Sequence, residues 1–121
     1  MKPDIANKDD IQSLVNFFYD KVKTDTTIGF FFTNVITIDW DKHIPLMCSF
    51  WENVLFYTGE YAGNPMKTHR KIHQQYQTAP AHFERWIALW NESVDMHFKG
   101  PNATKVKKHA LAIATVMLKN I

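Results

Sequence analysis

The sequence predicts an all-α protein of one domain. Apolar residues recur at intervals of three and four residues in almost every segment, while the alternation typical of strands is not convincing anywhere. The chain has 121 residues, of which 45% are apolar and 14% aromatic, enough for one domain with a sizeable core. We therefore expect a single domain over residues 1–121.

Composition and charge exclude several classes of protein. The net charge of +2 comes from 14 basic and 12 acidic residues, without a basic run that could follow a phosphate backbone, so no nucleic acid partner is expected. No stretch is long and apolar enough to span a membrane, and the N-terminal residues lack the apolar core of a secretory signal. The single cysteine excludes an internal disulfide. These observations predict a cytoplasmic protein without membrane partners.

The first helix is predicted to begin after Asn7, a good N-cap followed by the acidic residues Asp9 and Asp10. Its apolar face consists of Ile11, Leu14, Val15, Phe18 and Val22. In the following segment, "TDTTIGFFFTNVITID", Gly29 and several β-branched residues interrupt the pattern. We expect a turn, a short helical piece around Phe30–Phe32, and a loop.

A second helix is predicted in "DWDKHIPLMCSFWENVLFY", where the apolar stripe resumes. Pro45 is unusual there, because a proline inside a helix removes one backbone hydrogen bond and crowds the preceding turn. The helix is therefore expected to start close to Pro45 or to be distorted at it. The predicted stripe comprises Trp40, His43, Met47, Phe50 and Val54.

Three further helical segments complete the chain. After the turn-rich connector "YTGEYAGNP", Pro65 is predicted to open a short helix that carries His69 and His73. The next helix has Thr78 as its cap and Pro80 in its first turn, and the last one runs from about Ala103 to Leu118. Their apolar faces are Phe83, Trp86, Ile87, Trp90, Val94 and Phe98 in the former, and Val106, Ala110, Ile113 and Met117 in the latter.

Five helical pieces could form a simple bundle without any ligand. Two polar residues argue for a pocket instead: His43 lies on the apolar stripe between Trp40 and Met47, and Tyr19 borders the face made by Val15 and its neighbours. Buried polar groups need partners, so two of them directed inward from different helices indicate a polar pocket in an apolar core.

Three chemistries could use such residues. A zinc site could take His69 and His73, but "HRKIH" lacks the glutamate of a zinc protease and no third ligand stands at a recognisable spacing. Cys48 lies in "LMCSFW", which is typical of a helix interior and favours a structural cysteine over a nucleophile. Haem requires an axial histidine on a helix, an apolar slot and hydrogen-bond donors opposite, all of which the sequence can supply.

Several segments together carry a resemblance to a known family. The strings "FFYDKV", "IGFFF", "WDKHIPLMCSFW", "YAGNPMKTHRKIH", "HFERWIALW" and "VDMHFKGPNATKVKKHALAIATVM" resemble the group III truncated haemoglobins, in that order and over nearly the whole chain. The resemblance implies a truncated globin fold, a two-over-two helical sandwich around a haem. It also implies haem b, because no "CxxCH" motif is present for covalent attachment.

The resemblance assigns the iron ligand to His69, which follows the family's "GxPMxxH" pattern. Neutral imidazole would donate a nitrogen lone pair to iron, and its other ring nitrogen would need an acceptor. His73 lies one turn further and is left outside the metal site, free to contact a haem propionate or solvent. Lys67 and Arg70 are the other basic groups near the expected ligand.

On the distal side the family's hydrogen-bond donors match Tyr19, His43 and Trp86. Donors beside the ligand stabilise the charge that develops on O₂ more strongly in a dry pocket than in water, which favours O₂ over CO. Met47 is expected to face the same cavity one turn after His43. Other candidates for the apolar wall, each explained equally well by core burial, are Phe31, Phe32, Phe50, Trp51, Met66 and Met117.

The predicted function is binding of O₂, NO, CO or peroxide at this haem, with NO dioxygenation or peroxidase-like activity as enzymatic alternatives. Either reaction would need a separate reductase, since the chain has no flavin or nicotinamide motif. Two other hypotheses stay open: a six-coordinate haem sensor or electron carrier, with His43 or Tyr19 as sixth ligand, and a haem-free helical interaction module.

Overall fold

The structure is a computed structural model that describes residues 2–29, 40–56 and 80–120, with side chains up to residue 116. These residues form the helices α1 (Lys8–Thr24), α2 (Trp40–Phe56), α4 (Pro80–His97) and α5 (Pro101–Asn120). No strand occurs in the described ranges, which confirms the predicted all-α class.

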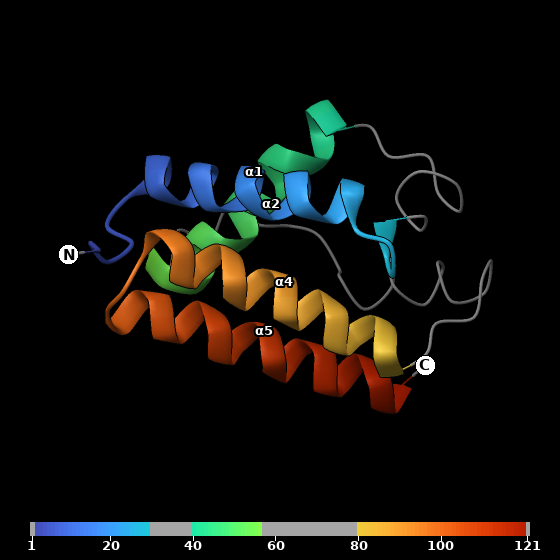
Figure 1. The fold of residues 1–121 in the computed structure, drawn as a ribbon. Coiled ribbons are helices and arrows are strands. Elements are labelled where there is room, and N and C mark those ends of the chain that lie inside the picture. The colour runs from blue at the N-terminus through green and yellow to red at the C-terminus, as the bar shows by residue number, and fades with distance from the viewer. Residues whose placement is uncertain (1, 30–39, 57–79, 121) are drawn as a thin grey trace.

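The four helices form two packed pairs. In Figure 1, α4 and α5 run antiparallel beside each other, while α2 crosses α1. The pairs meet through contacts of α1 with α4 and of α2 with α5, as expected for a two-over-two sandwich.

Helix α1 forms as the sequence predicts. The Asn7 side chain accepts a hydrogen bond of 2.9 Å from the backbone N–H of Asp10, so it satisfies one of the free donors of the first turn. Asp9 and Asp10 stand at the positive end of the helix dipole. The whole predicted apolar face is buried, together with Tyr19.

Helix α2 buries a different face from the predicted one. It starts at Trp40 and contains Pro45 in its second turn, but its buried residues are Cys48, Trp51 and Leu55. The predicted stripe, which includes His43 and Met47, is only half-buried. Two apolar stripes offset by one residue run along this helix, and helical period alone cannot decide which of them packs on the core.

The centre of the core joins α2, α4 and α5 through tryptophans. The rings of Trp51 and Trp90 stack at 4.6 Å between centroids with an angle of 18°. Trp90, which is 1% exposed, donates a hydrogen bond of 3.2 Å from Nε1 to the backbone carbonyl of Val106. The buried polar atom is thereby satisfied, as a dry core requires.

Asp4 anchors the N-terminal segment to the start of α5. Its carboxylate accepts hydrogen bonds of 3.0 and 2.9 Å from the backbone N–H groups of Asn102 and Ala103 at the start of α5. Asp4 therefore caps a helix that lies almost a hundred residues further along the chain. Gly100 permits this approach, since its φ of +148° favours glycine and a Cβ there would come within 2.6 Å of the Asp4 carboxyl carbon.

The turn after α1 is held by a second aspartate. Asp25 accepts hydrogen bonds of 3.0 Å from the backbone N–H groups of both Thr27 and Ile28. Its other oxygen accepts a hydrogen bond of 2.7 Å from the guanidinium of Arg85 in α4. The exit from α1 is therefore tied to the second helix pair.

Helix ends differ from the prediction by a few residues. Helix α4 stops at His97, one residue before Phe98, and α5 already begins at Pro101, where proline is well suited to a first helical position. The helical piece at Phe30–Phe32, the histidine helix opened by Pro65 and the cap residue Thr78 lie outside the described residues.

Candidate functional site

The structure brings Tyr19 and His43 together from two helices. The Tyr19 hydroxyl and His43 Nε2 share a hydrogen bond of 2.9 Å, and the imidazole tautomer decides which of the two donates. Tyr19 belongs to the buried face of α1, whereas His43 lies on the half-buried stripe of α2. This pair is the polar group that the sequence predicts within an apolar surrounding.

Burial sets the protonation state of Tyr19. The side chain is 7% exposed, and this burial, assisted by the nearby Cys48 thiol, raises the pKa of the Tyr19 hydroxyl well above its ordinary value. Tyr19 therefore stays a neutral hydroxyl, which can donate a hydrogen bond, over the whole physiological pH range.

Cys48 lies in the core and is a free thiol, 6% exposed. Burial, together with the charge of Glu52, raises its pKa, although Lys8 opposes the shift. A neutral buried thiol is a poor nucleophile, in agreement with a structural role.

Sequence reasoning missed Trp40 and Lys23 as part of this site. The Trp40 ring meets Tyr19 edge-on at 5.3 Å and His43 edge-on at 5.8 Å, and the Lys23 ammonium lies 4.2 Å from the Trp40 ring centre. The available signal was the spacing of Tyr19 and Lys23, four residues apart on one face of α1.

Trp86, the third predicted donor, reaches the same neighbourhood through Phe18. Its ring meets the Phe18 ring edge-on at 5.9 Å, and Phe18 in turn meets Tyr19 at 5.0 Å. Trp86 is half-buried and packs against the core together with Ile87. The Phe18 ring thus lies between Trp86 and the Tyr19–His43 pair in this chain of contacts.

The remaining predicted wall residues of α2 follow the same edge of the core. Met47 is half-buried and packs on the core cluster, and Phe50, also half-buried, meets the ring of Trp51 at 4.9 Å. Trp51 itself belongs to the buried core. The other predicted residues, His69, Met66, Phe31 and Phe32, lie outside the described ranges, as do His73, Lys67 and Arg70, and the Met117 side chain is not described.

This edge has the character that a flat apolar cofactor requires. Six large apolar side chains of α2 and α4, called the apolar row, pack against the core but are only partly buried, so each keeps apolar surface exposed. The row comprises Trp40, Ile44, Met47, Val54, Trp86 and Ile87. Since Tyr19 and His43 supply the polar groups beside this apolar surface, the described residues fit the distal wall of a haem site.

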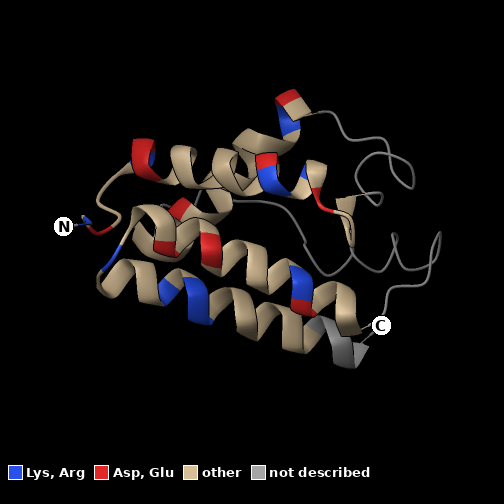
Figure 2. Ribbon diagram, viewed as in Figure 1, with Lys and Arg blue, Asp and Glu red and all other residues tan. Residues whose placement is uncertain are grey.

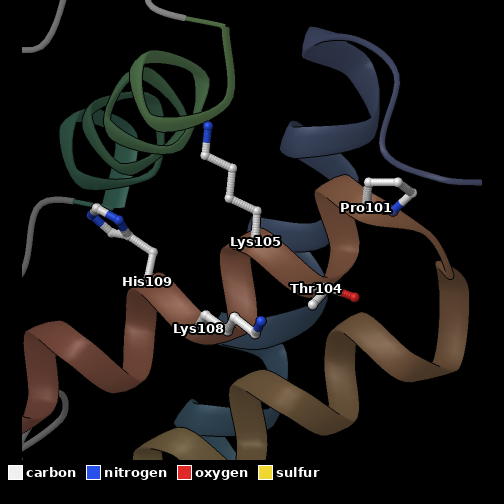
Figure 3. A pocket seen from close by; sticks show the side chains of 5 residues that line it. All are labelled: Pro101, Thr104, Lys105, Lys108 and His109. Carbon is white, nitrogen blue, oxygen red and sulfur yellow. The ribbon is translucent and has the colours of Figure 1, made fainter.

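A hollow lined mainly by polar residues lies on α5. It is an open depression of about 410 Å³ on α5, lined by Pro101, Thr104, Lys105, Lys108 and His109 (Figure 3). Figure 2 shows lysines on the same half of α5. Burial and Lys105 lower the pKa of His109, which favours its neutral form. None of the predicted haem-site residues lines this depression.

Metal-ligand clusters and membrane-spanning helices are both absent from the described residues. No group of three or more histidine, cysteine, aspartate or glutamate side chains is placed to hold a metal ion in residues 2–29, 40–56 and 80–116. Among the described helices, none combines the length and apolarity needed to cross a membrane.

Comparison with known proteins decides the family. No family model matches the chain. The group 3 truncated haemoglobin ctb of Campylobacter jejuni is 30% identical over 118 residues, which cover 95% of this chain and 91% of the relative. The chain belongs to the group III truncated haemoglobins.

The fold agrees with this membership. The crystal structure of the group III truncated haemoglobin from Campylobacter jejuni matches with a TM-score of 0.82 and 28% identity, covering 97% of this chain and 92% of that one. The predicted family and the two-over-two globin sandwich are therefore confirmed, and this truncated haemoglobin is a globin-type haem protein.

Proposed function

We propose that this truncated haemoglobin binds O₂, and also NO and CO, at a haem b whose iron is held by His69. The observation that carries the proposal is the Tyr19–His43 hydrogen bond of 2.9 Å beside the half-buried apolar row. The bound haem would supply an iron coordination position for a diatomic ligand.

The role of Tyr19 is to donate a hydrogen bond to the ligand. Because burial raises the pKa of Tyr19, its hydroxyl hydrogen is retained. When Nε2–H of His43 donates to the Tyr19 oxygen, the hydroxyl hydrogen of Tyr19 becomes available for a ligand. His43 therefore orients Tyr19 and polarises its hydroxyl, and both act in a low-dielectric surrounding where hydrogen bonds are stronger.

Trp86 is proposed as a further donor from α4. It contacts Phe18, which in turn contacts Tyr19, and its side chain is half-buried, so part of it stays exposed. Met47 and Phe50 of α2, with Met66 and Phe32, are proposed to form the apolar wall, which excludes water from the ligand.

The six-coordinate alternative is less well supported by the same geometry. His43 could serve as a sixth ligand only if its Nε2 gave up the hydrogen bond with Tyr19. The pair would have to separate, which leaves the buried Tyr19 hydroxyl without this partner. A five-coordinate iron with an open position is therefore part of the proposal.

The donor-rich pocket also suits NO dioxygenation or peroxide activation, with electrons from a separate reductase. Donors beside the ligand stabilise developing negative charge in either reaction. Turnover of NO or of peroxide by the reduced protein, compared with the Tyr19→Phe variant, would distinguish these activities from simple ligand binding.

The experiment that tests the proposal is absorption spectroscopy of the purified protein, supplemented with haem where needed. We expect a Soret band that shifts with O₂ and with CO, that is lost in His69→Ala, and that is retained in His97→Ala, where the replaced histidine stacks on Phe17 at the end of α4. A flat visible spectrum after haem addition would refute the proposal and favour an interaction module. A low-spin six-coordinate spectrum in both oxidation states, insensitive to gas, would favour a sensor or electron carrier.

A further inference from the structure

Trp40 occupies a place between the two helices that carry the distal pair. It is the first residue of α2, one turn before His43, and its side chain is half-buried. The rings of Trp40, His43 and Tyr19 meet edge-on in all three combinations, with centroids 5.1 to 5.8 Å apart. Three rings in this arrangement restrict each other's rotation, because aromatic pairs favour edge-to-face geometry.

Lys23 of α1 contacts the Trp40 ring. Its ammonium lies 4.2 Å from the Trp40 ring centre, a distance typical of a cation–π interaction. Lys23 follows Tyr19 by four residues, so both side chains leave the same face of α1. The indole is thus contacted by two side chains of one helix, Tyr19 and Lys23.

The contacts that hold Trp40 matter for His43, because His43 lies at the edge of the core. Its side chain is half-buried, in contrast to the buried Tyr19. A half-buried imidazole on a helix surface can adopt rotamers that turn it towards solvent, and each such rotamer breaks the hydrogen bond with Tyr19. The Trp40 ring lies one turn closer to the N-terminus of α2 and meets the His43 ring at 5.8 Å, so it occupies space beside the imidazole and limits its rotation.

We propose that Trp40, held against α1 by Lys23, is a positioning residue that keeps His43 turned towards the Tyr19 hydroxyl. We call Lys23 and Trp40 the clamp. The effect of the clamp on gas binding rests on the proposed function, but the clamp acts on His43 with or without a ligand. Neither residue touches the ligand in this proposal.

The variants that test the clamp differ in what they retain. Trp40→Ala removes the ring, Trp40→Phe keeps a smaller ring, and Lys23→Met keeps the length of the side chain but removes its charge. Lys21→Met is the matched control, since Lys21 lies on the same helix and forms an exposed ion pair of 3.0 Å with Glu92. In the described part of the chain the Lys21 ammonium pairs with Glu92, whereas the Lys23 ammonium lies over the Trp40 ring.

The first measurement is the ¹⁵N NMR shift of His43 Nε2, recorded on the protein as purified and, where it carries haem, in its diamagnetic ferrous CO form. We expect the hydrogen-bonded shift in the parent, Trp40→Phe and Lys21→Met, and its loss in Trp40→Ala. An unchanged shift in Trp40→Ala would overturn the proposal.

The second measurement is the C–O stretching band of the CO complex together with the O₂ dissociation rate. We expect Trp40→Ala to move the band to higher frequency and to raise the rate by about threefold to tenfold. Lys23→Met is expected to raise the rate by about twofold to fivefold, while Trp40→Phe and Lys21→Met stay near the parent. If Trp40→Phe behaves like Trp40→Ala in both measurements, the indole does not act as an orienting ring and the proposal fails.

Two controls separate this proposal from others. Thermal unfolding of all variants identifies a general loss of stability, and a band shift in Trp40→Ala that merely follows unfolding would count against a positioning role. If the parent binds no gas at all, the proposed function fails, while the His43 shift still decides whether Trp40 positions the imidazole.

Discussion

The centre of the core and its edge at Tyr19 and His43 both contain polar atoms among aromatic rings, but these atoms have different kinds of partner. In the centre, Trp90 donates to the backbone carbonyl of Val106, and the Ser93 hydroxyl donates at 2.8 Å to the carbonyl of Leu89. At the edge, the Tyr19 hydroxyl is paired with the side chain of His43. A backbone partner within a helix cannot move away, whereas a side-chain partner such as His43 can rotate. In the proposed function His43 donates to the Tyr19 oxygen and leaves the hydroxyl hydrogen for a ligand.

Burial follows the same division. Trp90 and Ser93 are 1% and 0% exposed, whereas His43, Trp40 and Trp86 are all half-buried. The centre is therefore expected to contribute more to stability, whereas the proposed function assigns ligand binding to the edge. Substitutions in the two regions are accordingly expected to affect different quantities, namely the free energy of unfolding and the kinetics of ligand binding.

The largest effect on stability is expected for Trp90→Ala. Removing this fully buried ring leaves a cavity. It also removes the stack on Trp51 and the hydrogen bond to the Val106 carbonyl. The free energy of unfolding is predicted to fall by about 3 to 5 kcal/mol, measured by urea denaturation. Trp40→Ala, at the edge, serves as the comparison and is expected to lose less. Equal losses would mean that the edge is as tightly packed as the centre.

The next effect concerns ligand binding and separates the two regions most clearly. Tyr19→Phe keeps the ring but removes the hydroxyl, so the lost hydrogen bond to a charged acceptor is worth about 1.5 to 3 kcal/mol. O₂ dissociation, followed after flash photolysis or rapid mixing, is expected to become about tenfold to a hundredfold faster. Stability changes little, because the ring still packs against Phe18. An unchanged dissociation rate would remove Tyr19 from the ligand site.

The centre of the fold was easier to predict from sequence than its edge. The face of α1 and the cap at Asn7 follow from local spacing and cap chemistry, and both are confirmed by the structure. The face of α2 was predicted wrongly, because its two neighbouring apolar stripes have the same period and only the packing of other helices selects between them. The predicted stripe nevertheless contains His43, which lies half-buried at the edge of the core and shares a hydrogen bond with Tyr19.

The contacts that sequence could not reveal are those between distant segments. The capping of α5 by Asp4 depends on a turn that places Gly100 beside the N-terminal residues. The position of Lys23 over Trp40 likewise depends on the crossing of α1 and α2. Resemblance to the family supplied His69 and the distal donors residue by residue, and those roles stay predictions.

A smaller effect, on the acid side of the stability curve, is expected from Asp4. Burial by itself would raise the pKa of Asp4, but the backbone hydrogen bonds from Asn102, Ala103 and Ile5 outweigh it and lower the pKa. A folded-state pKa below the unfolded value stabilises the fold above about pH 4, and this contribution is lost as the pH falls through the folded-state pKa.

The test compares the parent with Asp4→Asn by urea denaturation between neutral and acid pH. At neutral pH the variant is expected to lose about 1 to 2 kcal/mol. The difference between the two proteins is expected to shrink as the pH falls, because protonation weakens the cap in the parent as well. A constant difference at all pH values would show that charge on Asp4 does not matter to the cap.

The smallest effect is expected where an exposed group meets a buried one. In the pair of Arg85 and Asp25 the arginine side chain is 44% exposed and the aspartate only 3%. Arg85→Met removes a charge that water can replace, so the free energy of unfolding is expected to fall by about 0 to 1 kcal/mol, and less in high salt. Asp25→Ala is expected to cost more than Arg85→Met, because it also leaves the backbone N–H groups of Thr27 and Ile28 without their acceptor. If both variants lose the same amount, the ion pair and not the turn is what holds the end of α1, and the exposed surface contributes as much to the fold as a buried hydrogen bond does.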